Sequence, residues 1–408
     1  VYKRQALKVV PVTTASEPGG GGGGGGGAPW PAPTSPGPTD PGPGLVGAPF
    51  RVPATVSPAD LELRAVHRGP RALNVLEWTA ESPHRERLPM PTRPVVSDLG
   101  GDPDAFAAGL VRSVAAGDGR PGLQQLLVGA GRRVSQVLGP ELVGLVRAVL
   151  SLDLGRPARI LLLTEEASVP WELLTLEPVG PGESMFLATR AAVGRWYLVP
   201  QADVLPPPDH LEVADRAVIA TDDLPAAGHE AGQLVAALGF RVAPPTVDAT
   251  MAALQQHGVV HLACHGSWSA GDGIATLALS DGELTSLHVG GLDLAAHPLV
   301  FLNACHVASG TDLLGVPAGF PAALVATGAG AAVGPLWAVR DDHALAVALE
   351  FHREVLAGVP PAEVVRRLRS RAVEGGLTWA TPFAYQFVGH PGATMGVSDP
   401  DPPRRPER

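Results

Sequence analysis

The sequence is poor in cysteine and lysine, and each shortage excludes a class of protein. Its 408 residues include 2 cysteines, too few for a disulfide framework, and unpaired thiols indicate a reducing compartment, here the cytoplasm. The only lysines are Lys3 and Lys8, and the formal net charge is −10, which argues against nucleic acid as the main partner. Arginine in place of lysine, with abundant Ala, Gly and Pro, is typical of a GC-rich bacterial genome.

Long hydrophobic runs are also missing. The longest charge-free stretch, residues 313–339, contains Pro317, Pro321 and Pro335 and is rich in alanine and glycine. Such a stretch divides naturally into a helix and a strand, so we expect no membrane span and no membrane partner. No secretory signal is visible near the start of the chain.

Composition divides the chain into four parts. Residues 1–48 are rich in Gly, Pro, Ser and Thr and predict a disordered linker, because they offer little to bury. Residues 49–210 predict strands followed by helices and form an N-terminal part. Residues 211–392 form a core, and residues 393–408, rich in Pro and Arg, predict a disordered tail.

The core alternates strands with helices. Strands are expected at 217–221, 240–243, 259–265, 298–305, 331–339 and 383–388, with helices at 229–238, 250–257, 287–294, 316–327, 341–357 and 361–374. A hairpin is expected around Asp281-Gly282. The predicted fold class is therefore α/β, a mainly parallel sheet flanked by helices and preceded by a smaller α+β region.

Two apolar runs of the core end in reactive side chains. Residues 298–305 end on Cys305, and residues 259–266 end on His265 and Gly266. Short apolar runs of this kind are typical of strands buried on both faces, and ligands of open α/β sheets bind at the carboxyl ends of such strands. A nearby histidine activates a thiol for attack on a carbonyl. The two runs therefore predict a Cys/His nucleophilic site.

Strand alternation separates the candidate residues. His261 and His265 face one way and Cys264 the other, so Cys264 is interpreted as a packed thiol and His261 as a buried, hydrogen-bonded histidine. Cys305 is the predicted nucleophile and His265 its base or orienting partner. The backbone N–H groups of Gly266 and Cys305 are candidates for an oxyanion hole. His306 is interpreted as pointing elsewhere.

Other kinds of site fit less well. Cys264-His265 and Cys305-His306 resemble zinc ligands, but adjacent strand residues face opposite sides and no Cys-x₂-Cys spacing occurs, so no metal is expected. A zinc-bound structural domain stays open as a third interpretation. No Gly-x-Ser-x-Gly elbow occurs, and the glycines near Gly328 precede their strand, unlike those of a dinucleotide loop. No cofactor is expected.

The region resembles the CHAT domain, a caspase-like peptidase module related to separase, of clan CD. The resemblance covers residues 158–390 and rests on His261-Leu-Ala-Cys-His265-Gly266, Leu302-Asn-Ala-Cys305, Gly319-Phe-Pro-Ala-Ala-Leu, Val333-Gly-Pro-Leu-Trp337-Ala-Val-Arg-Asp341-Asp342 and Val169-Pro-Trp171-Glu-Leu-Leu174. It implies that residues 211–392 are a caspase-like catalytic core with His265 and Cys305 as the dyad of an endopeptidase. Trp337 and Asp341 match the family but are interpreted as structural.

The resemblance implies a cysteine endopeptidase that cleaves a protein partner, such as one encoded nearby, in bacterial defence or cell death. Activity is expected to need a partner, a domain or a cleavage event that orders the loops between His265 and Cys305. Related peptidases often use an acidic residue near the nucleophile to bind a basic P1 side chain, but that neighbour here is Asn303. The preference is left open, with weaker substrate-binding candidates at Asp272, Asp281, Asn303 and Asp312. The rival hypothesis is a catalytically inert CHAT-like interaction module.

Overall fold

An eleven-stranded sheet forms the centre of the structure, a computed structural model that describes residues 58–69, 74–177, 184–199, 205–213, 215–269, 274–305, 311–313 and 316–396. All of these residues belong to one unit, Val52–Arg408, so the predicted linker at 1–48 lies outside them. In spatial order the strands are β3 (Val95–Asp98), β2 (Val75–Glu81), β1 (Leu61–His67), β4 (Ala158–Thr164), β5 (Ala191–Tyr197), β17 (Tyr385–Val388), β16 (Ala331–Pro335), β13 (Leu299–Asn303), β9 (Val259–Ala263), β7 (Arg216–Ala220) and β8 (Arg241–Val242).

Nine of the eleven strands form two parallel groups that run in opposite directions, and β2 and β3 extend one edge of the sheet by antiparallel pairing. Strands β1, β4, β5 and β17 are parallel to one another, and so are β16, β13, β9, β7 and β8. Strand β17 joins the groups because it pairs antiparallel with β16 and parallel with β5. The strands of the N-terminal part therefore extend the same sheet as the core, and the α/β fold class predicted from the sequence is confirmed.

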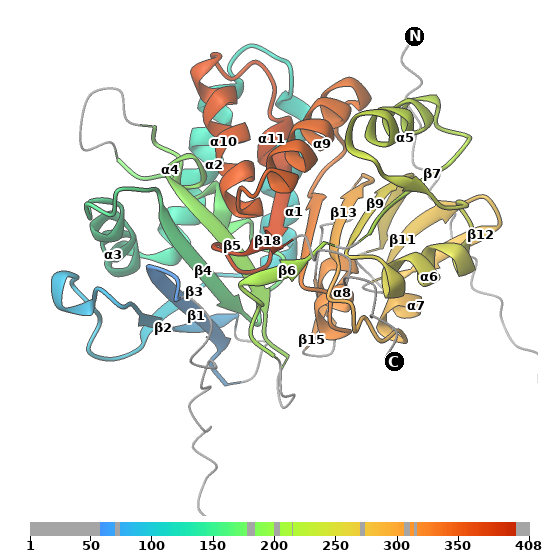
Figure 1. Cartoon of the computed structure of the whole chain (residues 1–408). Coiled ribbons are helices and arrows are strands. Elements are labelled where there is room, and N and C mark those ends of the chain that lie inside the picture. Colours follow the sequence, from blue (N-terminus) through green and yellow to red (C-terminus); the bar gives the residue numbers. More distant parts are fainter. Residues whose placement is uncertain are drawn as a thin grey trace, which may run out of the picture. The chain divides into compact units, whose positions relative to one another are not determined.

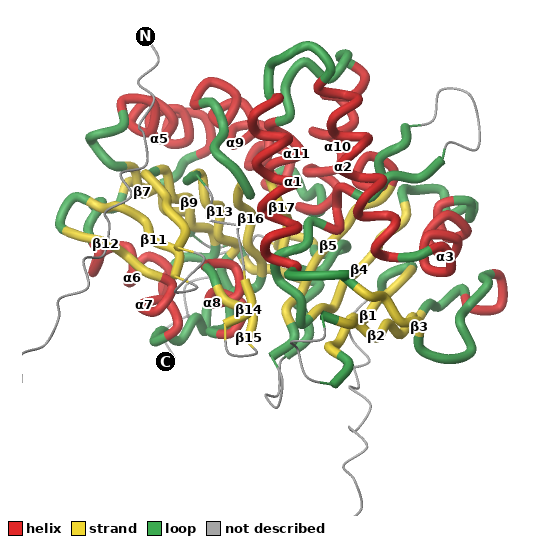
Figure 2. Tube along the Cα trace, turned by 180° about the vertical axis from the view of Figure 1, so that it is seen from behind, coloured by secondary structure: helices red, strands yellow, loops and turns green. Residues whose placement is uncertain are grey.

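Helices cover both faces of the second group, as Figures 1 and 2 show. Strand β13 explains why: Leu299 and Phe301 pack into one hydrophobic cluster, and Val300 and Leu302 pack into another on the opposite face. The first cluster includes residues of α5 (Pro225–Leu238), α9 (Asp341–Leu356) and α10 (Pro361–Glu374). The second includes residues of α6 (Val247–Gln256), α7 (Ser286–Gly290) and α8 (Phe320–Ala326).

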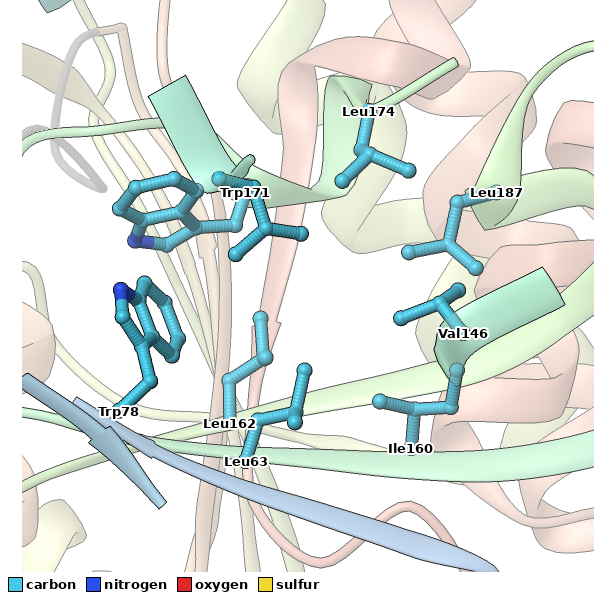
Figure 3. A pocket seen from close by; sticks show the side chains of 9 residues that line it. Leu63, Trp78, Val146, Ile160, Leu162, Trp171, Leu174 and Leu187 are labelled. Atoms are coloured by element: carbon cyan, nitrogen blue, oxygen red, sulfur yellow. The ribbon is translucent and has the colours of Figure 1, made fainter. Parts of the chain in front are cut away.

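The first group of strands has its own core. Trp78 of β2 and Trp171 pack edge to face, with ring centroids 5.1 Å apart. They border a cavity of about 10 Å³ that is lined mainly by aliphatic side chains and is too small for more than one water (Figure 3). The helices of this region are η2 (Arg85–Arg87), α1 (Pro103–Gly117), α2 (Leu123–Leu138), α3 (Pro140–Leu150), η3 (Trp171–Leu173), α4 (Leu187–Arg190) and, from the far end of the chain, α11 (Thr381–Ala384).

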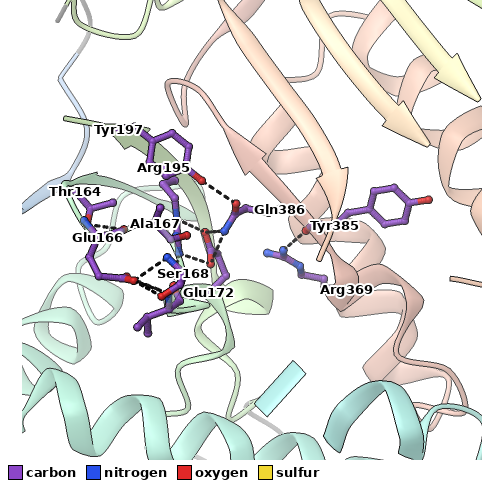
Figure 4. A network of polar contacts seen from close by, with 11 residues as sticks. Thr164, Glu166, Ala167, Ser168, Glu172, Arg195, Tyr197, Arg369, Tyr385 and Gln386 are labelled. Carbon is purple, nitrogen blue, oxygen red and sulfur yellow. Dashed lines mark hydrogen bonds and ion pairs between the residues drawn. The ribbon is translucent and has the colours of Figure 1, made fainter. Parts of the chain in front are cut away.

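A buried ion pair lies beside β17, the strand that joins the two groups (Figure 4). Arg195 of β5 is fully buried, and its Nη2 lies 3.0 Å from Glu172 Oε2. Its guanidinium also donates to the carbonyl oxygens of Ala167 and Val169, at 3.2 and 2.7 Å. Gln386 of β17 donates to the same Glu172 carboxylate at 3.3 Å. The Val-Pro-Trp-Glu segment is thereby held between β5 and the strand that joins the two halves of the sheet.

The described residues also form three smaller sheets, and two of the boundaries predicted from the sequence near them are wrong. The predicted strand 259–265 ends at Ala263, because the chain bends at buried Cys264 and starts β10, which pairs with β11 instead of continuing β9. The predicted helix 316–327 starts at Phe320, because Gly319 has φ 115°, outside the helical region. These sheets comprise β10 (His265–Ser269), β11 (Ile274–Leu279) and β12 (Gly282–Thr285); β14 (Thr311–Leu313) and β15 (Val316–Ala318); and β6 (His210–Glu212) and β18 (Thr394–Gly396).

Strand β18 lies within the range predicted as the tail. Thr394–Gly396 pair in parallel with β6, and Val213 N–H donates to Gly396 O at 2.7 Å. The boundary predicted at residue 393 therefore falls before the last strand. The remainder of that range lies outside the described residues.

Candidate functional site

The register of three parallel strands brings together the segments that follow them. Ala220 of β7, Ala263 of β9 and Asn303 of β13 lie side by side at the carboxyl ends of their strands. His265 follows two residues after Ala263, and Cys305 two residues after Asn303. Alternate side chains of β13 pack into two different hydrophobic clusters, so a slip of one residue would exchange the two sets of contacts and is disfavoured.

His265 and Cys305 line one cavity of about 220 Å³ at this edge of the sheet. The polar residues of its wall come from four segments: α5, the ends of β9 and β13, and the start of α9. The complete lining consists of Leu224, Ala226, Ala227, Glu230, Ala263, Cys264, His265, Asn303, Ala304, Cys305, Val339, Asp341 and Ala344.

Cys305 is partly buried beside the start of helix α9. Burial raises the pKa of its thiol, and the negative charge of Asp341 acts in the same direction. The N–H of Val339 opposes both, because it donates a hydrogen bond to the sulfur and thus favours the thiolate. Val339 was not a candidate in the sequence, since a backbone donor leaves no residue-type signal.

His265 is the first residue of β10 and pairs with Ala278 of β11. Its side chain is 60% exposed, and its Nε2 lies 3.8 Å from Asp223 Oδ2. His265 is therefore largely exposed to solvent while it lines the cavity.

Cys264 differs from Cys305 in burial. It packs in the hydrophobic cluster on the other face of β9, together with Leu262, and burial raises the pKa of its thiol to about 12. Neither cysteine forms a disulfide. The structure thus places Cys264 as the sequence analysis expected, as a packed thiol.

Asn303 is held from two sides. Its Nδ2 donates to Glu230 Oε1 and Oε2 at 2.7 and 2.9 Å, and its Oδ1 accepts from the Tyr385 hydroxyl at 2.6 Å. These partners come from α5 and β17, so Asn303 connects two layers of the fold two residues before Cys305. Glu230 was missed in the sequence, although an acidic residue on the apolar stripe Ala227-Ala231-Leu234 of a predicted helix is a signal that could have found it.

Two buried histidines, His261 and His352, follow Glu230 in a chain of close polar contacts. His261 Nε2 is 2.9 Å from Glu230 Oε1, although the two are not aligned as a hydrogen bond, and His261 Nδ1 is 3.0 Å from His352 Nε2. The His261 ring stacks on Phe301, with centroids 5.2 Å apart. Burial lowers the pKa of His352 well below its usual value, and His261 and Arg216 add to this shift.

We expect this histidine to make the fold acid-sensitive. His352 has an ordinary pKa of 6.5, so below pH 6.5 the unfolded chain binds a proton that the folded chain excludes. Stability therefore falls as the pH is lowered through 6.5, by about 2 kcal/mol between pH 7 and pH 5 if the folded His352 stays neutral. Between pH 7 and pH 5, His352→Gln should lose about 2 kcal/mol less unfolding free energy than the parent chain, as measured by urea unfolding at both pH values.

His229→Gln is the matched control for this experiment, because His229 lies exposed on α5. It should keep the full pH dependence of the parent chain. An equal pH dependence in His352→Gln and the parent would contradict the assignment.

The other candidate residues lie as follows. Gly266 is in β10 and lies opposite Leu277 of β11. Asp281 Oδ1 accepts a hydrogen bond of 2.9 Å from the Val247 N–H at the start of α6. Neither residue is part of the cavity lining. The backbone of Asp312 belongs to β14. Asp272, His306 and the side chain of Asp312 lie outside the described part of the chain.

The described residues contain neither a metal-binding cluster nor a membrane-spanning helix. Within the described residues, no cluster of three or more His, Cys, Asp or Glu side chains has the arrangement of a metal site. In the same part of the chain, no helix combines the length and the apolar character needed to cross a bilayer.

A family model described as the CHAT domain matches residues 154–383, more than half of the 408 residues. The chain belongs to the CHAT domain family. The match begins just before β4 and ends in α11, so it contains His265 and Cys305. It leaves out β1–β3 and α1–α3, although those strands complete the same sheet as the rest of this CHAT domain.

Two solved structures illustrate what this CHAT domain resembles. Separase in the Saccharomyces cerevisiae separase–securin complex has 11% identity and a TM-score of 0.48, with 83% of this chain and 30% of that chain covered. The chain thus spans less than a third of that separase chain. The complex of the Porphyromonas gingivalis RgpB pro- and mature domains has 13% identity and a TM-score of 0.44, covering 64% of this chain and 71% of that chain. No curated protein matches the chain.

Proposed function

We propose that this CHAT domain is a cysteine endopeptidase in which Cys305 is the nucleophile and His265 its acid–base partner. The observation that carries the proposal is that both side chains line one cavity, at the carboxyl ends of neighbouring parallel strands, with the Val339 N–H donating to the sulfur. A cavity, a thiol and an imidazole at one sheet edge are what acyl transfer through a thioester requires.

The reaction follows from these groups. His265 takes the proton of the Cys305 thiol, and the electron pair left on sulfur attacks the carbonyl carbon of the scissile peptide bond. The backbone N–H groups of Gly266 and Cys305 are proposed to stabilise the resulting oxyanion. The protonated imidazole then donates its proton to the leaving amine, which breaks the C–N bond, and a water deprotonated by His265 hydrolyses the thioester.

The substrate proposed is a protein. Family membership supports a bacterial effector that cleaves a partner encoded nearby in defence or cell death, with activation by a second protein or domain. The two unpaired thiols support a cytoplasmic location. Of the substrate-binding candidates, Asn303 is proposed first because it lines the cavity, whereas Asp281 does not.

Alkylation tests the proposal without knowledge of the substrate. Iodoacetamide should label Cys305 at least about tenfold faster than Cys264 in the native chain, because Cys264 is buried and its thiol has a pKa of about 12. Peptide mass mapping over time gives both rates, and urea-unfolded protein shows that both thiols can react. Native rates that do not differ, or no labelling of Cys305, would favour the inert interaction module.

A further inference from the structure

The turn that follows β7 lies against the end of β9. Thr221 N–H donates to Ala263 O at 3.1 Å, and Leu224 N–H donates to Thr221 O at 3.4 Å, which closes the turn. Because Ala220 and Ala263 are in register, this turn runs beside the segment that leads to His265. The sheet therefore places Asp223 next to His265 although 42 positions separate them in the sequence.

Asp223 has the carboxylate that faces the imidazole. Its Oδ2 lies 3.8 Å from His265 Nε2, and both side chains are more than half exposed. A surface imidazole is held by few contacts, so a neighbouring anion has a large share in deciding which nitrogen carries the proton. With Nε2 turned to Asp223, Nδ1 is the nitrogen that remains for the cavity.

We propose that Asp223 is a positioning residue for His265. It keeps the proton on Nε2 and stabilises the imidazolium, and it leaves Nδ1 to exchange the proton of the Cys305 thiol. The catalytic role of Asp223 rests on the proposed function, but its contact with His265 can be tested without a cleavage assay. Catalytic hydrogen bonds are often long in unliganded enzymes and tighten with substrate, which a contact of 3.8 Å allows.

Other ionisable groups also lie near the His265 imidazole. Glu230, Asp341, Cys264 and Cys305 line the same cavity as His265. All of them stay in place when Asp223 is replaced, so a change seen in that variant reports Asp223 alone. Asp222 is an exposed acidic neighbour in the same turn and offers a matched control.

The test is the tautomer of the neutral His265 imidazole, read from its ring ¹⁵N chemical shifts by NMR and assigned by the signals that His265→Gln removes. If Asp223 holds the proton on Nε2 across the 3.8 Å contact, the Nε2–H form should dominate in the parent chain. Asp223→Ala should raise the share of the Nδ1–H form by about twofold or more, and Asp223→Glu should retain most of the parent preference. Asp222→Ala, which removes the neighbouring charge of the same turn, should leave the tautomer as in the parent chain.

Cleavage kinetics supply the second measurement. In Asp223→Ala, kcat/KM should be about tenfold lower at its optimum, and Asp222→Ala should keep the rate of the parent chain. An unchanged tautomer in Asp223→Ala, or an equal change in Asp222→Ala, would overturn the proposal. A changed tautomer in a chain that cleaves nothing would keep the contact and reject the peptidase.

Discussion

Cys305→Ala is expected to abolish peptide cleavage, and His265→Ala to slow it by about 10²- to 10⁴-fold, with the fold intact. The two effects differ because the thiol forms the covalent intermediate, whereas a water can replace the imidazole poorly as a base. His265 is largely exposed and Cys305 sits at a cavity wall, so neither side chain carries much of the core. Initial rates on the peptide that the parent chain cleaves fastest in a fluorogenic library measure the effect.

Matched variants separate chemistry from folding. Cys264→Ala removes the other thiol of the chain, and His229→Ala removes an exposed histidine of α5, so both should retain cleavage within about twofold. Circular dichroism and the urea midpoint should be unchanged in Cys305→Ala. If Cys264→Ala abolished cleavage instead, the nucleophile would be misassigned, and if His265→Ala were fully active, the dyad would be wrong.

The site residues that could be predicted from the sequence are those whose position follows from the apolar pattern of a single segment. An apolar run such as Leu299–Leu302 is typical of a strand buried on both faces, and in a parallel sheet such strands end at the edge where ligands bind. The same argument applied to β9 placed His265 beside Cys305. Helix α9 was predicted to within one residue at its end, because its apolar periodicity and its two N-terminal aspartates are both local.

The features that escaped prediction depend on partners far apart in the chain. Gln386 meets Glu172 across 214 positions, and Tyr385 meets Asn303 across 82. Strand β17 was expected, but its antiparallel pairing with β16 was not, since strand order and direction are set by tertiary packing. The bend at Cys264 was missed for a related reason: Ala263-Cys264-His265 has no glycine or proline to mark it.

Arg195→Met is expected to destabilise the fold by about 3 to 5 kcal/mol, the largest loss of stability predicted here. Arg195 is fully buried and donates to Glu172 and to two backbone carbonyls, so methionine would fill the space but leave Glu172 as an uncompensated buried charge. Burial already raises the pKa of nearby Glu166, against the attraction of Arg195, so the loss of the cation leaves two carboxyl groups to be neutralised. The free energy of unfolding in urea measures the change.

Two further variants show whether the charge, and not the volume, is responsible. Arg195→Met combined with Glu172→Gln should lose less stability than Arg195→Met alone, because only Glu166 is then left to be neutralised. Arg68 offers the exposed counterpart: it is 61% exposed and lies 3.9 Å from Glu77, so Arg68→Met should cost less than about 1 kcal/mol. Equal losses in Arg195→Met and Arg68→Met would mean that the ion pair contributes no more than a surface contact. The junction between the two groups of strands would then depend on the apolar packing around β17.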